Sequence, residues 1–178
     1  MSSKDMRITF RYPARSTPPR YAAMEISEGM VAGSEGTMIT SMGRFTRQSR
    51  GKGYGAVVTL TIDSAATETH ISLDCHGRGF RGQGYIEDVP EQGYDDWKQG
   101  AVVGVDYALR AAGLEPCGVV ITKIEGLTTD TNPTIVAVAA MDAIWKGLGV
   151  TPQADVDAYV KAVAMDSWNQ PYDAIPNF

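Results

Sequence analysis

The chain has 178 residues, of which 43% are hydrophobic and 21% charged, with a formal net charge of -5. This composition is typical of a globular protein with a buried core, and it excludes a disordered chain, a membrane-embedded protein and a general polyanion binder. The charge is uneven, because residues 1–55 hold nine lysines and arginines against four acids, whereas residues 56–178 hold seven against seventeen.

Cysteine use and hydropathy predict the compartment. Cys75 and Cys117 are far apart and form no CxxC motif, which is typical of free thiols in a reducing environment. The first residues lack the apolar run of a secretory signal, and no stretch approaches the roughly 20 apolar residues of a membrane span. We therefore expect a cytoplasmic protein with no membrane partner.

The first 43 residues are interpreted as an extension that contains strands. Residues 7–12 alternate polar and apolar side chains, which predicts a strand with one solvent-facing side, and residues 37–42 are a second, shorter candidate. The methionines of this region are expected to fill gaps in the core; they are Met24, Met30, Met38 and Met42.

A basic, glycine-rich stretch, residues 44–55, is predicted to be a loose loop. It leads into residues 56–62, where β-branched side chains crowd together and Val58, Leu60 and Ile62 share one face, so a strand is expected. Residues 69–75 are predicted to form a second strand that pairs with the first.

Helices are predicted mainly in the second half of the chain. The expected elements are a helix over residues 96–112, a strand over 119–124, a helix over 134–146 and a C-terminal helix within 151–170. Asp95 is the expected cap of the first helix, and Gly113 ends it as a left-handed residue. Asn132 followed by Pro133 is the start signal of the second helix.

This order of elements predicts one α+β domain over residues 1–178. Its core would be a two-layer sandwich, in which two helices cover one face of a short mixed sheet of about four strands. The C-terminal helix within residues 151–170 is an addition to that core.

Residues 47–58, Arg-Gln-Ser-Arg-Gly-Lys-Gly-Tyr-Gly-Ala-Val-Val, resemble the opening of domain IV of bacterial elongation factor G. Further matches follow in that domain's order, so the resemblance covers about residues 44–148. The family implies a four-stranded sheet, two helices and a left-handed βαβ crossover, a fold shared with the second domain of a small-subunit ribosomal protein. It also implies two tip loops that contact tRNA and mRNA in the ribosomal decoding site, here residues 47–54 and 126–132.

Several departures from that family bear on function. The chain contains no GxxxxGK motif followed by serine or threonine, so the nucleotide-binding signature of a GTPase is absent from it. Arg50 stands where the family has glycine, and Thr129 stands where it usually has a histidine before the aspartate. Because one fold hosts many functions, the resemblance predicts the fold more directly than the ligand.

The basic loop and the implied tip loops supply the candidate RNA contacts. Cations neutralise phosphates, glycines let the backbone approach an anion, and aromatic rings stack on bases. The candidates are Arg44, Arg47, Gln48, Ser49, Arg50, Lys52, Tyr54, Arg78, Arg81, Thr129 and Asp130, with Phe45 as a further stacking residue. The leading hypothesis is a non-enzymatic module that binds ribosomal or other RNA and needs no cofactor. The alternative for the loop is a charged surface segment whose aromatic residues belong to the core.

Other readings stay open. His70, Asp74 and His76 alternate along one side of the expected strand over residues 69–75 and are weak metal candidates, although a polar outer sheet face explains them as well. Glycine-rich matches at residues 51–56 and 77–82 lack the strand–turn–helix context of a dinucleotide site. A small-molecule-binding protein or enzyme on the same fold, or a structural oligomer, is the alternative function.

Overall fold

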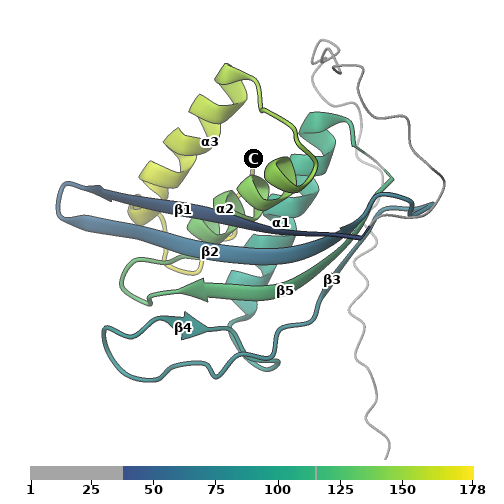
Figure 1. Ribbon diagram of the computed structural model, residues 1–178. Helices are drawn as coiled ribbons and strands as arrows, with labels where there is room; N and C mark the ends of the chain where they lie inside the picture. Colours follow the sequence, from purple (N-terminus) through teal and green to yellow (C-terminus); the bar gives the residue numbers. More distant parts are fainter. Residues whose placement is uncertain (1–37, 115) are drawn as a thin grey trace, which may run out of the picture.

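The computed structural model describes residues 38–114 and 116–178 (Figure 1). The strand predicted over residues 7–12, and Met24 and Met30, lie outside the described residues. The elements are β1 (Met38–Ser49), β2 (Lys52–Asp63), β3 (His70–Leu73), β4 (Glu87–Asp88), α1 (Asp95–Ala112), β5 (Gly118–Gly126), α2 (Pro133–Gly147), α3 (Ala154–Asp166) and the short 3-10 helix η1 (Ser167–Asn169). None of the helices in these ranges has the length and apolar character needed to cross a bilayer.

The strands form one mixed sheet in the order β1-β2-β5-β3, and β4 also pairs with β5. β2 lies antiparallel to both β1 and β5, whereas β3 runs parallel to β5. The prediction that residues 69–75 pair with residues 56–62 was therefore wrong, because β1 and β5 occupy the two edges of β2. The predicted α+β class, a sheet with helices packed on it, is confirmed, with about five strands in place of four.

The buried layer lies between the sheet and its helices. Val58, Leu60 and Ile62 of β2 are fully buried on one face, as their alternation predicted. α2 crosses β1 closely, because Gly43 has no side chain and a Cβ there would overlap the backbone of Ala139 and Ala143. Figure 1 shows α1 and α2 on the same side of the sheet.

The stretch over residues 44–55 is a β-hairpin, and the prediction of a loose loop was wrong. β1 and β2 pair up to Ser49 and Lys52, which leaves only Arg50 and Gly51 in the turn. Both turn residues have positive φ, 50° and 76°, as in the tight turns that match the twist of a hairpin. The alternation of buried and exposed side chains continues to the turn, and cross-strand pairing outweighs the flexibility of the glycines.

The helix ends agree in part with the sequence signals. Asn132 caps α2, since its side chain accepts a hydrogen bond from the Ile135 N–H (3.0 Å), and Gly113 ends α1 in the left-handed region, both as predicted. Asp95 is not the cap of α1: Tyr94 holds that position with a left-handed backbone, and Asp95 is the first helical residue.

Met38 and Met42 do not fill gaps in the core. Both lie on the face of β1 that points away from the helices, and both are exposed.

Candidate nucleic-acid interface

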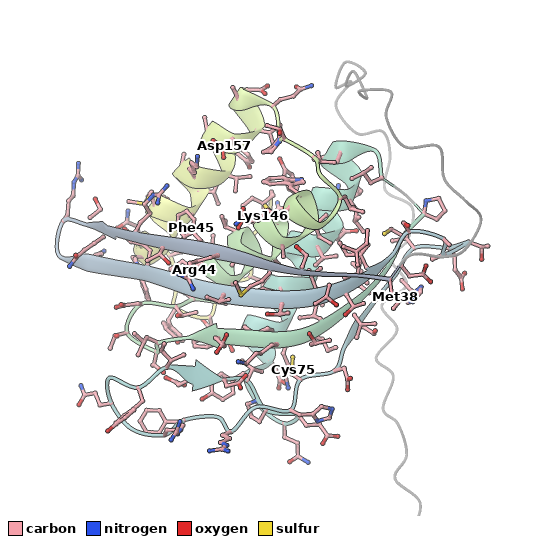
Figure 2. The ribbon with its side chains drawn as sticks, viewed as in Figure 1. Met38, Arg44, Phe45, Cys75, Lys146 and Asp157 are labelled. Atoms are coloured by element: carbon pink, nitrogen blue, oxygen red, sulfur yellow. The ribbon has the colours of Figure 1, made fainter. Side chains whose placement is uncertain are left out.

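The hairpin distributes its cations over two faces. Successive side chains of a strand point to opposite sides, and directly paired residues share a side. Arg47 and Lys52 therefore lie on the helix side of the sheet, and Arg44 on the outer side, while Arg50 is in the turn. Figure 2 shows Arg44 next to Phe45, whose ring is turned to the core. The predicted basic surface is thus wrapped around the hairpin.

The two aromatic residues of the hairpin are not available for stacking on a base. Tyr54 is 5% exposed and Phe45 is 6% exposed, so both rings belong to the core. The Tyr54 hydroxyl donates a hydrogen bond to the carbonyl oxygen of Met165 (3.1 Å), and the guanidinium of Arg47 lies 5.8 Å from the centre of the Phe45 ring. These residues hold the hairpin to the body, which corrects the stacking role predicted for them.

The second implied tip loop, between β5 and α2, lies against the hairpin. β5 ends at Gly126, and beyond that point the loop covers the edge of β2. The Gly55 N–H donates a hydrogen bond to the Asp130 carbonyl (2.8 Å), and the Thr131 hydroxyl donates one to the Gly55 carbonyl. Buried or edge backbone groups need such partners. The carboxylate of Asp130 lies over Gly53, where a Cβ would overlap it, while Thr129 is exposed. Of the two candidates in this loop, Thr129 is the accessible one.

A buried carboxylate fixes this loop from the other side. Glu87 of β4 is 2% exposed and accepts hydrogen bonds from the Tyr94 hydroxyl (2.5 Å), the Thr128 N–H (3.0 Å) and the Thr128 hydroxyl. Burial raises the pKa of Glu87, but the bonds from Thr128 and Tyr94 outweigh it and hold that pKa below its usual value. Burial, together with the bond to Glu87, raises the pKa of Tyr94. Sequence reasoning missed Glu87, although its alternation with the buried Val89 was a signal of an inward-facing acid.

The loop over residues 77–86 presents cations and aromatic rings together. Arg78 and Arg81 are exposed, and Phe80 and Tyr85 expose 65% and 61% of their surface. The chain then enters β4, which pairs with the end of β5, so this loop lies at the same end of the sheet as the hairpin turn (Figure 1). Sequence reasoning singled out the arginines of this loop but not its aromatic residues as the accessible ones.

The cations of the chain differ in their partners. Those on the helices and β5 mostly have an acid beside them, as in the pairs Arg110–Asp106 (2.8 Å), Lys123–Glu125 (2.8 Å), Lys146–Asp142 (2.6 Å) and Lys161–Asp157 (2.5 Å). Within residues 38–114 and 116–178, no ion pair is formed by the cations of the hairpin and of the 77–86 loop, namely Arg44, Arg47, Arg50, Lys52, Arg78 and Arg81. Unneutralised positive charge therefore gathers at one end of the sheet.

A groove of about 410 Å³ lies beside this charge, between the hairpin and α3 with η1. Its lining residues are Ser49, Arg50, Lys52 and Tyr54 from the hairpin, and Ala162, Met165, Asp166 and Asn169 from the opposite wall. The candidates Arg50 and Lys52 thus line this groove as well as facing solvent. Gln48 is exposed on the outer side of β1 and is not among the lining residues.

The weak metal candidates do not assemble into a site. His76 lies 2.8 Å from Asp74, and both are exposed, whereas His70 lies at the start of β3 against Gly118. In the part of the chain that the structure describes, no three side chains of metal-ligating type gather. Cys75 and Cys117 are buried and free, as predicted, and burial raises the pKa of Cys75 to about 11. A thiol with that pKa stays protonated near neutral pH and is a poor nucleophile or ligand.

Known proteins resemble this chain in fold, but they give no information on its chemistry. No protein-family model matches the chain, and no curated protein matches it. Among solved structures, a crystal structure of a protein from Thermus thermophilus is similar, with a TM-score of 0.51 and 14% sequence identity over 72% of this chain. The chain spans 20% of that protein's length. At this identity the similarity is one of fold alone.

Proposed function

We propose that this chain is a non-enzymatic RNA-binding module that contacts RNA, including ribosomal RNA, through the end of the sheet formed by the hairpin turn and the 77–86 loop. The observation that carries the proposal is the separation of the cations: those at this end have no acid partner among the described residues, and those on the body mostly do. An RNA phosphate can therefore bind the first set without breaking an existing ion pair.

Electrostatics favours a directed contact. Each phosphate that a lysine or arginine neutralises releases condensed counterions, which makes RNA binding strong at low salt and weak at high salt. The body of the protein is acidic, since residues 56–178 carry seventeen acids, and it repels a polyanion. RNA is thus expected to approach only the basic end.

Base stacking is assigned to the 77–86 loop. Phe80 and Tyr85 are the exposed aromatic residues next to Arg78 and Arg81, and a ring beside cations is the usual platform for a single-stranded base. The hairpin then supplies charge, and the loop supplies the stacking surfaces. The resemblance of residues 47–58 to domain IV of elongation factor G also favours RNA, because the two tip loops of that family contact tRNA and mRNA.

The proposal is tested by binding to ribosomal subunits and to a labelled single-stranded RNA across a salt series of roughly 50 to 200 mM. The double substitution Arg50→Glu with Lys52→Glu is expected to abolish binding. The matched control, Lys146→Glu with Lys161→Glu, makes the same change of charge on α2 and α3 and is expected to bind nearly as the wild type does. Equal losses in the two variants, or no binding by the wild type at the lowest salt, would refute the proposed function.

A further inference from the structure

The groove between the hairpin and α3 is built from segments more than one hundred residues apart. Two hydrogen bonds join the hairpin to the opposite wall: Tyr54 Oη to Met165 O (3.1 Å) and Trp168 Nε1 to Gly53 O (2.9 Å). A third, Asn132 Nδ2 to Ser167 Oγ (2.9 Å), joins η1 to the start of α2. Its volume, about 410 Å³, lies within the usual range for small-molecule sites and admits a single nucleotide. The C-terminal helix α3, which has no counterpart in the elongation-factor resemblance, supplies one wall.

The two walls differ in chemistry. Arg50 and Lys52, on the hairpin, have no acid partner among the described residues. On the opposite wall, the carboxylate of Asp166 accepts hydrogen bonds from Asn169 Nδ2 (2.7 Å) and Gln170 Nε2 (3.4 Å). A carboxylate has about four acceptor positions, so Asp166 retains the capacity to accept further donors from a ligand.

The positive charge on one wall and the carboxylate on the other favour some ligands over others. Inorganic phosphate would be attracted by Arg50 and Lys52 and repelled by Asp166, so it matches only one wall. A nucleotide has an anionic phosphate at one end and a base with N–H donors at the other, and it matches both. Ala162 and Met165, which line the groove on the α3 wall, supply apolar contacts for the base.

We propose that this groove binds one guanine nucleotide unit, which RNA presents if the function proposed above holds. Arg50 and Lys52 bind its phosphate, and the Asp166 carboxylate accepts from the base edge. Guanine places two donors, N1–H and the N2 amino group, side by side, so that one carboxylate can accept from both. Adenine, cytosine and uracil lack such an adjacent pair of donors, which makes guanine the preferred base.

The first test uses mononucleotides and does not depend on RNA binding. GMP and UMP are titrated while the Asn169 amide and the Trp168 indole N–H signals are followed by NMR, since Asn169 lines the groove and the Trp168 N–H bonds to Gly53 of the hairpin wall. GMP is expected to shift these signals at lower concentration than UMP. In Ala162→Phe the added ring fills the groove and the shifts are lost, whereas Ala158→Phe, one turn earlier on α3 and also exposed, retains them.

The second test uses oligouridine with and without one central guanosine, with fluorescence anisotropy as the readout. The guanosine is expected to raise affinity about tenfold, as for one bidentate base contact. Asp166→Asn and Ala162→Phe should remove that gain, so that each variant binds the two oligonucleotides with equal affinity, with thermal unfolding as a check on folding.

The outcomes separate the two proposals. Oligouridine binding with no gain from guanosine, and no GMP shift at the groove, overturns the groove proposal and leaves the RNA-binding function standing. The opposite result is also informative: GMP shifts the groove signals in the wild type but not in Ala162→Phe, while neither oligonucleotide binds. That result supports the groove proposal and overturns the RNA-binding function.

Discussion

Thr128 donates two hydrogen bonds to the buried carboxylate of Glu87, one from its backbone N–H and one from its hydroxyl. The contact joins the β5–α2 loop to β4 across 41 residues of sequence, and the Tyr94 hydroxyl binds the other oxygen of the same carboxylate. Because the loop also contacts the hairpin, Glu87 stands at the base of the candidate interface without being part of its surface.

Removing this charge should destabilise the fold. Glu87→Gln replaces an acceptor-only carboxylate with a neutral amide, in which N–H₂ takes the place of one acceptor oxygen, and hydrogen bonds to charged groups contribute roughly 1.5–3 kcal/mol each. We expect the free energy of unfolding, measured with urea, to fall by about 2 kcal/mol. Glu91→Gln is the control, because the Glu91 side chain is exposed, and it should change the free energy little. Equal effects of the two substitutions would contradict the role assigned to Glu87.

The Glu87 carboxylate should also make the free energy of unfolding depend on pH. The pKa of Glu87 is lower in the folded protein than in the unfolded chain, where a glutamate titrates near about 4.3. The stabilisation is therefore complete above the unfolded pKa and is lost as the pH falls through the folded pKa. The difference in unfolding free energy between wild type and Glu87→Gln should be constant near neutral pH and shrink below about pH 4. A difference that grows on acidification would refute this assignment.

Gly53 should be sensitive to a single methyl group. A Cβ at this position would overlap the Asp130 carboxylate, whereas a Cβ at Gly55 would lie 4.0 Å from the Asp130 Cβ, an ordinary contact. Gly53→Ala is expected to lower the free energy of unfolding by about 1 kcal/mol, the low end of the range for overpacking, because the obstacle is the end of a side chain that can rotate, and Gly55→Ala to be tolerated. The double variant Gly53→Ala with Asp130→Ala should recover most of the loss. Failure of this rescue in thermal unfolding would show that Asp130 is not the obstacle.

Arg50 is expected to favour RNA binding at a cost to the stability of the hairpin turn. Its φ of 50° is uncommon for residues other than glycine, asparagine and aspartate. Asn-Gly is the preferred pair in such a turn. Arg50→Asn should therefore raise the unfolding free energy by up to about 1 kcal/mol while weakening RNA binding. Arg50→Lys keeps the charge and should leave both quantities nearly unchanged. A loss of stability in Arg50→Asn would contradict the turn geometry.

The sequence predicted those parts of the fold that depend on local pattern. The buried face of β2 followed from the alternation of Val58, Leu60 and Ile62, and both the Asn132 cap and the Gly113 stop followed from residue type. Local signals could not predict the partner of β3, because an isolated strand carries no information on which edge it joins.

The candidate site was predicted less completely, for a related reason. Its charged residues are visible in the sequence as a cluster, but the burial of Tyr54 and Phe45 depends on the helix side of the sheet and on α3. The groove depends on Asp166 and Asn169, more than one hundred residues away from the hairpin that they face. Such relationships arise from tertiary packing and have no short-range signature.

The bond from Trp168 to the Gly53 carbonyl spans 115 residues of sequence, and it carries a consequence for the order of folding. Contacts between distant positions form late, because a long loop must close first. During synthesis the sheet with α1 and α2 can assemble before α3 and η1 have emerged, but the tip of the hairpin lacks the Trp168 hydrogen bond until that residue has been made. The hairpin end of the sheet is thus expected to reach its final structure later than the rest of the sheet.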